Sequence, residues 1–153
     1  MSSDLDIKRL HHDVALRLSS VGQRYTDGRQ QIVEFLAGSP RPVGVAAIVK
    51  ELPDIPQSSA YRSLGVLTQL NVTRRIAGTD DNGYYELSED LVGRHHHHAL
   101  CESCGRVVDI DSSSKLEKAL TEAARIASEQ TGFTLDAHRM DLVGLCRDCA
   151  NKT

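Results

Sequence analysis

The chain has 153 residues, of which 40% are hydrophobic and 25% charged, and its formal net charge is −3. This composition is typical of a soluble globular protein, and the length suits one ordinary domain or two small ones. No apolar run approaches the roughly 18 residues of a membrane span, and the N-terminus lacks a secretion signal, so we expect a cytoplasmic protein without membrane contact. The net negative charge argues against a protein that binds nucleic acid nonspecifically through a strongly positive surface.

The charges are divided unevenly along the chain. Residues 1–88 hold 10 Lys and Arg against 10 Asp and Glu, whereas residues 89–153 hold 8 against 11. The acidic excess therefore belongs to the second part, and a site for a polyanion is expected in the first. We take 1–88 and 89–153 as the expected domains.

Residues 1–88 show the periodic patterns of short helices followed by a hairpin. Apolar spacing and capping residues predict helices over the ranges 4–19, 27–37, 42–52 and 56–70. Strands are expected over 71–78 and 83–88, around a turn at 79–82. This order is the layout of a winged helix-turn-helix domain.

The second part shows a different alternation. Strands are predicted over 95–101 and 105–111, a helix over 112–132, and a final strand over 133–146. Ser114 and Glu117 have the spacing of a capping box at the start of that helix. The predicted fold class is therefore α+β, with an N-terminal winged helix-turn-helix followed by a small α/β domain.

Four cysteines form two Cys-x-x-Cys pairs, Cys101 with Cys104 and Cys146 with Cys149. Two such pairs, each at the end of a predicted strand, suit a closed tetrahedral zinc site whose role is to stabilise the domain. Disulfides are disfavoured in a reducing compartment, and a thioredoxin-like dithiol needs one pair rather than two. Four unliganded buried cysteines are the remaining alternative.

Four consecutive histidines lead directly into the first cysteine pair. In an extended segment His95 and His97 would point to one face, and His96 and His98 to the other. One run could thus supply two separate metal sites, or it could be a solvated strand edge. Candidate partners are spread over the chain: Glu86, Glu89, Asp90, Asp109, Glu117 and His138. Such mixed sites suit zinc, iron(II), manganese, cobalt or nickel.

These residues resemble those of the ferric uptake regulator family of metal-responsive repressors, over nearly the whole chain. The matching segments are GQRYTDGRQQIVEFL, IPQSSAYRSLGVLTQLNV, GYYELS, HHHHALCESCGRVVDI and FTLDAHRMDLVGLCRDC. The resemblance implies a homodimer that binds a double-stranded DNA operator through its N-terminal domain. It also implies that the C-terminal domain dimerises and that a divalent metal acts as co-repressor.

The resemblance also implies three ligand sets. Structural zinc would be held by Cys101, Cys104, Cys146 and Cys149. A second-domain site would use His95, His97, Glu117 and His138. The regulatory site would use Glu86, His96, His98 and Asp109. Pro42 and Val43 stand where members commonly carry a further histidine, so the regulatory metal stays open between zinc or iron(II) and, less readily, manganese or nickel.

For DNA, the resemblance points to the helix that begins near Pro56. The residues expected to contact base edges or phosphates are Arg24, Gln57, Ser58, Ser59, Tyr61, Arg62 and Arg74. The alternative for Tyr61 is a half-buried helix aromatic, and for Arg74 a solvated wing residue. Three other functions stay open: a peroxide-sensing repressor of the same family, a zinc-dependent hydrolase, and a metal-storage or adapter module. We expect no enzyme, because no HExxH pattern is present.

Overall fold

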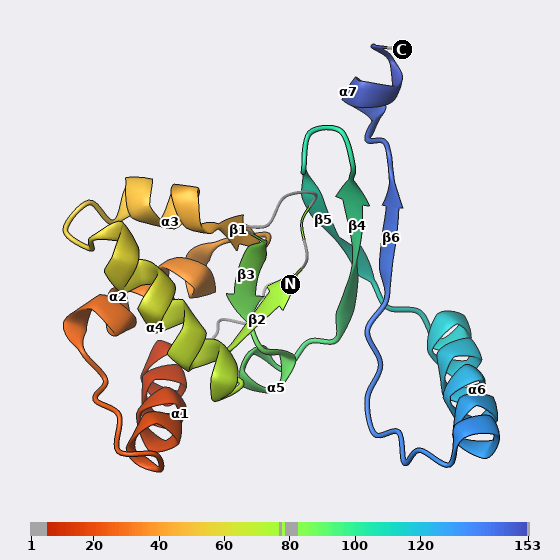
Figure 1. The fold of residues 1–153 in the computed structure, drawn as a ribbon, viewed down its shortest axis with the longest axis horizontal. Coiled ribbons are helices and arrows are strands. Elements are labelled where there is room, and N and C mark those ends of the chain that lie inside the picture. The colour runs from red at the N-terminus through yellow and green to blue at the C-terminus, as the bar shows by residue number, and fades with distance from the viewer. Residues whose placement is uncertain (1–5, 77, 79–82, 153) are drawn as a thin grey trace. The chain divides into compact units, whose positions relative to one another are not determined.

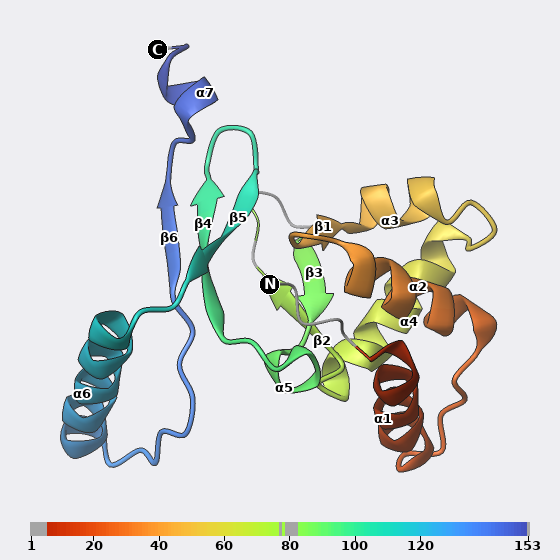
Figure 2. The same ribbon diagram turned by 180° about the vertical axis from the view of Figure 1, so that it is seen from behind.

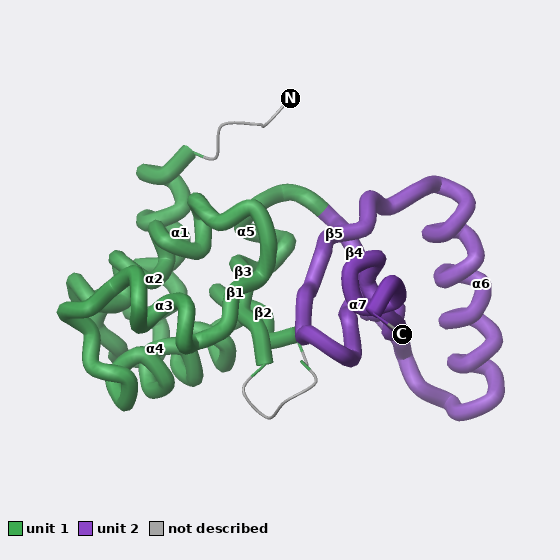
Figure 3. The backbone as a smooth tube through the Cα atoms, turned by 90° about the horizontal axis from the view of Figure 1, so that it is seen from above, with its two compact units in different colours: residues 1–94 green, residues 95–153 purple. Residues whose placement is uncertain are grey.

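The computed structural model describes residues 6–76, 78 and 83–152, so the expected turn at 79–82 lies outside the described residues. The chain forms two compact units, Met1–Arg94 and His95–Thr153 (Figure 3). Within the described residues, none of the helices has the length and apolar character needed to cross a membrane.

The first unit contains helices and a small sheet (Figure 1). Its helices are α1 (Ile7–Ser19), α2 (Asp27–Gly38), α3 (Val45–Glu51), α4 (Gln57–Gln69) and α5 (Glu89–Val92), and its strands are β1 (Val43–Gly44), β2 (Thr73–Ile76) and β3 (Tyr84–Leu87). The antiparallel sheet has the order β1-β3-β2. The four predicted helices and the two antiparallel strands are found, but the helix predicted over 42–52 begins only at Val45, because Val43 and Gly44 pair with β3 as strand β1. The two-residue β1 and the one-turn α5 were not predicted, because both are too short to show a periodic pattern.

Local capping and a shared core explain why these helices form. The Thr26 hydroxyl accepts a hydrogen bond from the Arg29 amide at 3.4 Å, which satisfies one orphan donor at the start of α2. Asp6 caps α1 in the same way, accepting from the amides of Lys8 and Arg9. The apolar faces of α1 to α4 meet in one core that includes Val14, Leu18, Ile32, Val33, Ile48, Leu64 and Leu67.

Leu64 tests this core. It is fully buried, so Leu64→Ala should lower the free energy of unfolding of the first unit by about 2–5 kcal/mol. Leu16 is 55% exposed, and Leu16→Ala should change it by less than about 0.5 kcal/mol. The chain has no tryptophan and all four tyrosines lie in this unit, so tyrosine fluorescence during urea unfolding reports on it alone. An equal loss of unfolding free energy in the two variants would contradict the assigned core.

Ion pairs hold the segment after β3 to the first unit. The Arg74 guanidinium donates to Glu86 Oε1 through Nη2 at 2.6 Å and to Glu89 Oε1 through Nη1 at 3.0 Å. Arg17 of α1 pairs with Asp90. These contacts explain why residues 89–94 group with the first unit, although the sequence pattern assigned them to the second.

The second unit is a three-stranded sheet with two helices, as Figure 2 shows. Its elements are β4 (His96–Cys101), β5 (Val107–Asp111), α6 (Ser114–Thr131), β6 (Asp141–Gly144) and α7 (Arg147–Ala150). The central strand β4 pairs antiparallel with β5 and parallel with β6. The final strand is much shorter than the predicted 133–146, since residues 133–140 form no regular element, and α7 was not predicted.

The start of α6 differs from the prediction by one residue. The N-cap is Ser113, whose hydroxyl accepts from the Leu116 amide at 3.2 Å, so Ser114 is the first helical residue. Glu117 does not reach back to the cap as a capping box requires. Its carboxylate instead accepts from the Ser112 hydroxyl at 2.5 Å and contacts His97. The capping box predicted from Ser114 and Glu117 is therefore wrong.

The second unit has a sparse core. None of the residues of α6, all of which the structure describes, is buried. The buried side chains among the described residues of this unit are His96, His97, His98, Leu100, Cys101 and Val107. A domain of this size with so few buried apolar side chains needs stabilisation from bound metal or a partner.

Candidate metal centres

The two cysteine pairs meet at the end of the sheet. Cys101 ends β4, and Cys146 precedes α7. The four Sγ atoms of the pairs lie within 4.8 Å of one another, and the Sγ atoms of Cys104 and Cys146 are 3.8 Å apart. Zinc–sulfur bonds of about 2.3 Å in a tetrahedron place two sulfurs roughly 3.8 Å apart. The donor set and its spacing therefore fit a closed zinc site.

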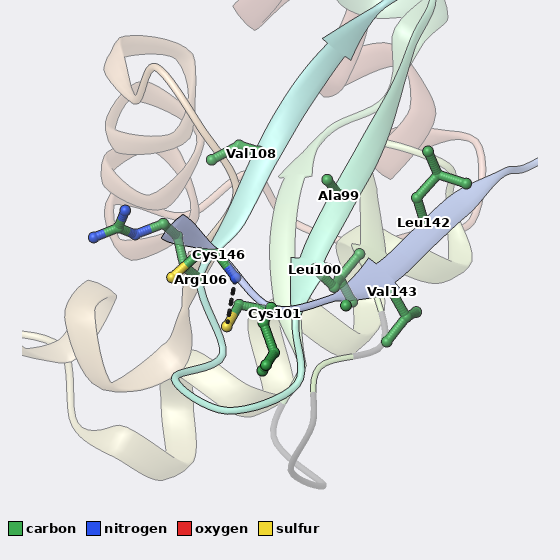
Figure 4. A pocket seen from close by; sticks show the side chains of 10 residues that line it. Ala99, Leu100, Cys101, Arg106, Val108, Leu142, Val143 and Cys146 are labelled. Carbon is green, nitrogen blue, oxygen red and sulfur yellow. Dashed lines mark hydrogen bonds between the residues drawn. The ribbon is translucent and has the colours of Figure 1, made fainter. Parts of the chain in front are cut away.

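Backbone amides prepare this cluster for a metal. The Cys146 amide donates to Cys101 Sγ at 3.3 Å (Figure 4). Together with the Cys104 amide, this donor lowers the pKa of the Cys101 thiol to about 6. The thiolate is the form that binds zinc, so the fold favours the ligand state of this sulfur.

An apolar hollow lies beside the cysteine cluster. Its volume is about 330 Å³, and Leu145 is among the residues that line it. Leu100, Val108, Leu142 and Val143 also line it (Figure 4). All of these except Leu100 are exposed by more than 40%. Exposed apolar side chains thus gather on β5, on β6 and just after β6, as is typical of a surface that binds another protein.

A second cluster joins β4, α6 and the segment before β6. The Nε2 atoms of His97, His138 and His95 lie 2.8, 3.0 and 3.4 Å from oxygens of the Glu117 carboxylate. His95 Nε2 and His138 Nε2 are only 3.1 Å apart. Four donors at these distances suit one ion held by three imidazoles and a carboxylate.

Glu117 is kept ionised in this cluster. The hydrogen bond from the Ser112 hydroxyl and that from His97 lower the pKa of its carboxyl to about 2. An ionised carboxylate is the form that ligates a divalent ion, and the Ser112 hydroxyl orients it by donating to Oε1, the same oxygen that His97 contacts. Ser112 was not predicted from the sequence, where it was one of three serines in the presumed helix start.

A third set of donors lies on the other face of β4. The Nε2 atoms of His96 and His98 are each 3.8 Å from Asp109 Oδ1, and both imidazoles are buried. The two rings lie edge to face at a centroid distance of 4.9 Å. Ligands of one ion at about 2.1 Å lie roughly 3.0–3.5 Å apart, so a small contraction brings these three donors onto a metal.

Glu86, the fourth predicted regulatory ligand, belongs to the first unit. It lies on β3 opposite Arg74 on β2, and its Oε1 accepts from both Nε and Nη2 of that arginine. The arginine therefore orients the Glu86 carboxylate through one of its two oxygens.

Comparison with known proteins decides the family. A sequence model of the ferric uptake regulator family matches residues 20–143. The chain belongs to the ferric uptake regulator family. The peroxide-responsive repressor PerR of Staphylococcus saprophyticus is 29% identical over 99% of this chain and 100% of its own length. Membership makes the chain a metal-dependent DNA-binding transcriptional repressor, as its sequence predicted.

Solved structures agree on the fold. The ferric uptake regulator of Helicobacter pylori, described as having three functional metal-binding sites, has a TM-score of 0.74 at 19% identity, with 94% of this chain and 93% of that chain covered. The Vibrio cholerae ferric uptake regulator has a TM-score of 0.67 at 25% identity, with 86% and 98% covered. The α+β architecture predicted for this family member is confirmed.

The residues predicted to contact DNA lie on the first unit of this regulator. Helix α4 buries Ala60, Leu64 and Leu67 and leaves Gln57, Ser58, Tyr61 and Arg62 exposed, while Ser59 is half-buried. Arg24 is exposed beside the start of α2. Arg74 differs from these, because its side chain is only 17% exposed and pairs with Glu86 and Glu89.

Proposed function

We propose that the repressor is controlled by a divalent ion held by His96, His98 and Asp109, with Glu86 as a predicted fourth ligand. The observation that supports this is the convergence of two imidazole nitrogens on one buried carboxylate oxygen, at 3.8 Å each. A bound ion would supply positive charge between these donors. The chain's own residues set the geometry, since β4 and β5 carry all three donors in fixed register.

Metal control requires a difference in affinity between two conformers. The ion must bind the conformer that fits the operator more tightly than the other conformer. Couplings of this kind are about 1–3 kcal/mol, which corresponds to roughly 5–150-fold in operator affinity.

The proposed assembly is a homodimer formed through the second unit. The exposed apolar side chains Leu142, Val143, Leu145 and Phe133 support this, because a second copy would remove them from water. The cysteine cluster beside them would hold zinc as a structural ion that keeps this surface in shape. In this arrangement zinc stabilises the fold, while the histidine–aspartate set responds to metal concentration.

The proposed DNA contact is the exposed N-terminal half of α4 in the major groove. The double substitution Tyr61→Ala with Arg62→Ala should weaken operator binding at least tenfold, because base-edge contacts contribute about 1–3 kcal/mol each. Gel-shift titration at one stated salt concentration measures this. Lys118→Ala, which removes a charge from the exposed face of α6, is the control and should bind as the unaltered protein does. Unchanged binding of the double variant would favour an adapter module instead.

A peroxide-sensing repressor is a second candidate. Two histidines and one carboxylate form the donor set of many iron(II) sites that react with oxygen species, and His96, His98 and Asp109 have this composition. The name of the Staphylococcus saprophyticus relative adds support. Peroxide should then abolish operator binding of the iron(II)-loaded protein and spare the manganese-loaded protein. Equal survival of both forms would exclude peroxide sensing.

A further inference from the structure

The feature that carries a further inference is a row of three residues across the second sheet. His98 lies on the central strand β4, directly opposite Asp109 of β5 and directly opposite Asp141 of β6. Side chains at one register position of neighbouring strands share a face of the sheet. His98 is therefore flanked by a carboxylate on each side.

The two ring nitrogens of His98 face different carboxylates. Nε2 lies 3.8 Å from Asp109 Oδ1, on the side that also holds Nε2 of His96. Nδ1 lies 3.3 Å from Asp141 Oδ1, within hydrogen-bond distance. The imidazole is buried, so its choice of tautomer is set by these neighbours rather than by water.

We propose that Asp141 is a positioning residue of the regulatory site. It accepts a hydrogen bond from Nδ1–H of His98 and thereby leaves the Nε2 lone pair directed at the metal position beside Asp109. A carboxylate behind a ligating histidine fixes the ring orientation and raises the basicity of the ligand, and its loss typically weakens metal binding by 10–100-fold. This inference rests on the proposed function, because it assigns a role toward the same ion.

The affinity test uses cobalt(II) as the probe, in a His138→Ala background in which the other histidine cluster lacks one nitrogen. Asp141→Leu should weaken cobalt binding at the regulatory site by 10–100-fold, measured by its visible absorption. Asp141→Asn keeps an acceptor oxygen and should restore much of this affinity. Asp136→Leu, an exposed aspartate of the same unit, is the matched control. Zinc content and far-UV circular dichroism confirm that each variant is folded.

The second test measures the tautomer of His98 directly. Nitrogen-15 NMR of the protein with zinc only in the cysteine site should show His98 protonated on Nδ1, and Asp141→Leu should shift it toward the Nε2–H form. A wild-type His98 protonated on Nε2 would overturn the proposal. So would unchanged cobalt affinity in Asp141→Leu, an equal loss in Asp136→Leu, or an asparagine variant no better than leucine.

A further variant separates this proposal from the function on which it rests. His98→Ala should remove cobalt binding at the site. If His98→Ala binds cobalt as the unaltered protein does, the regulatory site itself is misassigned. If His98→Ala loses binding while Asp141→Leu keeps it, only the role of Asp141 is refuted.

Discussion

Replacing Cys146 by serine should remove zinc and unfold the second unit while the first unit stays folded. The reason lies in the composition of the second unit, where buried imidazoles take the place of an apolar core and no residue of α6 is buried. Zinc binding contributes roughly 10–16 kcal/mol to the folding of small zinc-finger peptides. The few apolar side chains that β4 and β5 bury cannot supply a stabilising free energy of that size.

Zinc content by mass spectrometry and mass by analytical ultracentrifugation measure this effect. We expect loss of one zinc per chain and of the proposed dimer, while tyrosine fluorescence stays native because every tyrosine lies in residues 1–94. Glu102→Ala, an exposed change inside the first Cys-x-x-Cys pair, is the control and should retain zinc. A Cys146→Ser protein with full zinc content and a native dimer would contradict the structural role of the cluster.

Chelation of the regulatory metal should lower operator affinity by about 5–150-fold, the range of ordinary allosteric couplings. His98→Ala should have the same low affinity with or without metal, because it removes one of the two nitrogens near Asp109. The measurement is a titration of operator binding with zinc, iron(II), manganese and nickel. All samples need one salt concentration, since salt alone changes such affinities by orders of magnitude.

His12→Ala is the matched control for this experiment, since His12 is an exposed histidine of α1 in the first unit. It should respond to metal as the unaltered protein does. Operator affinity that is indifferent to a chelator of the histidine sites would exclude metal control. A response that survives in His98→Ala would move the control to the His95, His97, Glu117 and His138 cluster.

Much of this fold could be predicted because its signals are local. The helices of the first unit follow from apolar spacing and from the Thr26 cap. The cysteine pairs are recognised as zinc ligands from their Cys-x-x-Cys spacing. The division of the histidine run between two faces follows from the geometry of any strand. These inferences need only the neighbours of each residue along the chain.

What could not be predicted depends on contacts between distant segments. Asp141 lies beside His98 only because β6 pairs with β4 in parallel at that register, and no local pattern encodes a register. Arg74 was expected to contact phosphate, yet it bonds two carboxylates that lie 12 and 15 residues away. Ser112 likewise gains its role from the position of Glu117 in the folded cluster.

Because the histidines alternate between the two faces of β4, both histidine clusters depend on whether the number of residues before each histidine in the strand is odd or even. A slip of β4 by one residue against β5 and β6 would turn each histidine to the opposite face. Both pairs of histidines would then change faces at once. The carboxylates of each cluster would lose the histidines that contact them. A deletion or insertion of one residue inside the run should therefore disable both clusters together, whereas a substitution disables only one.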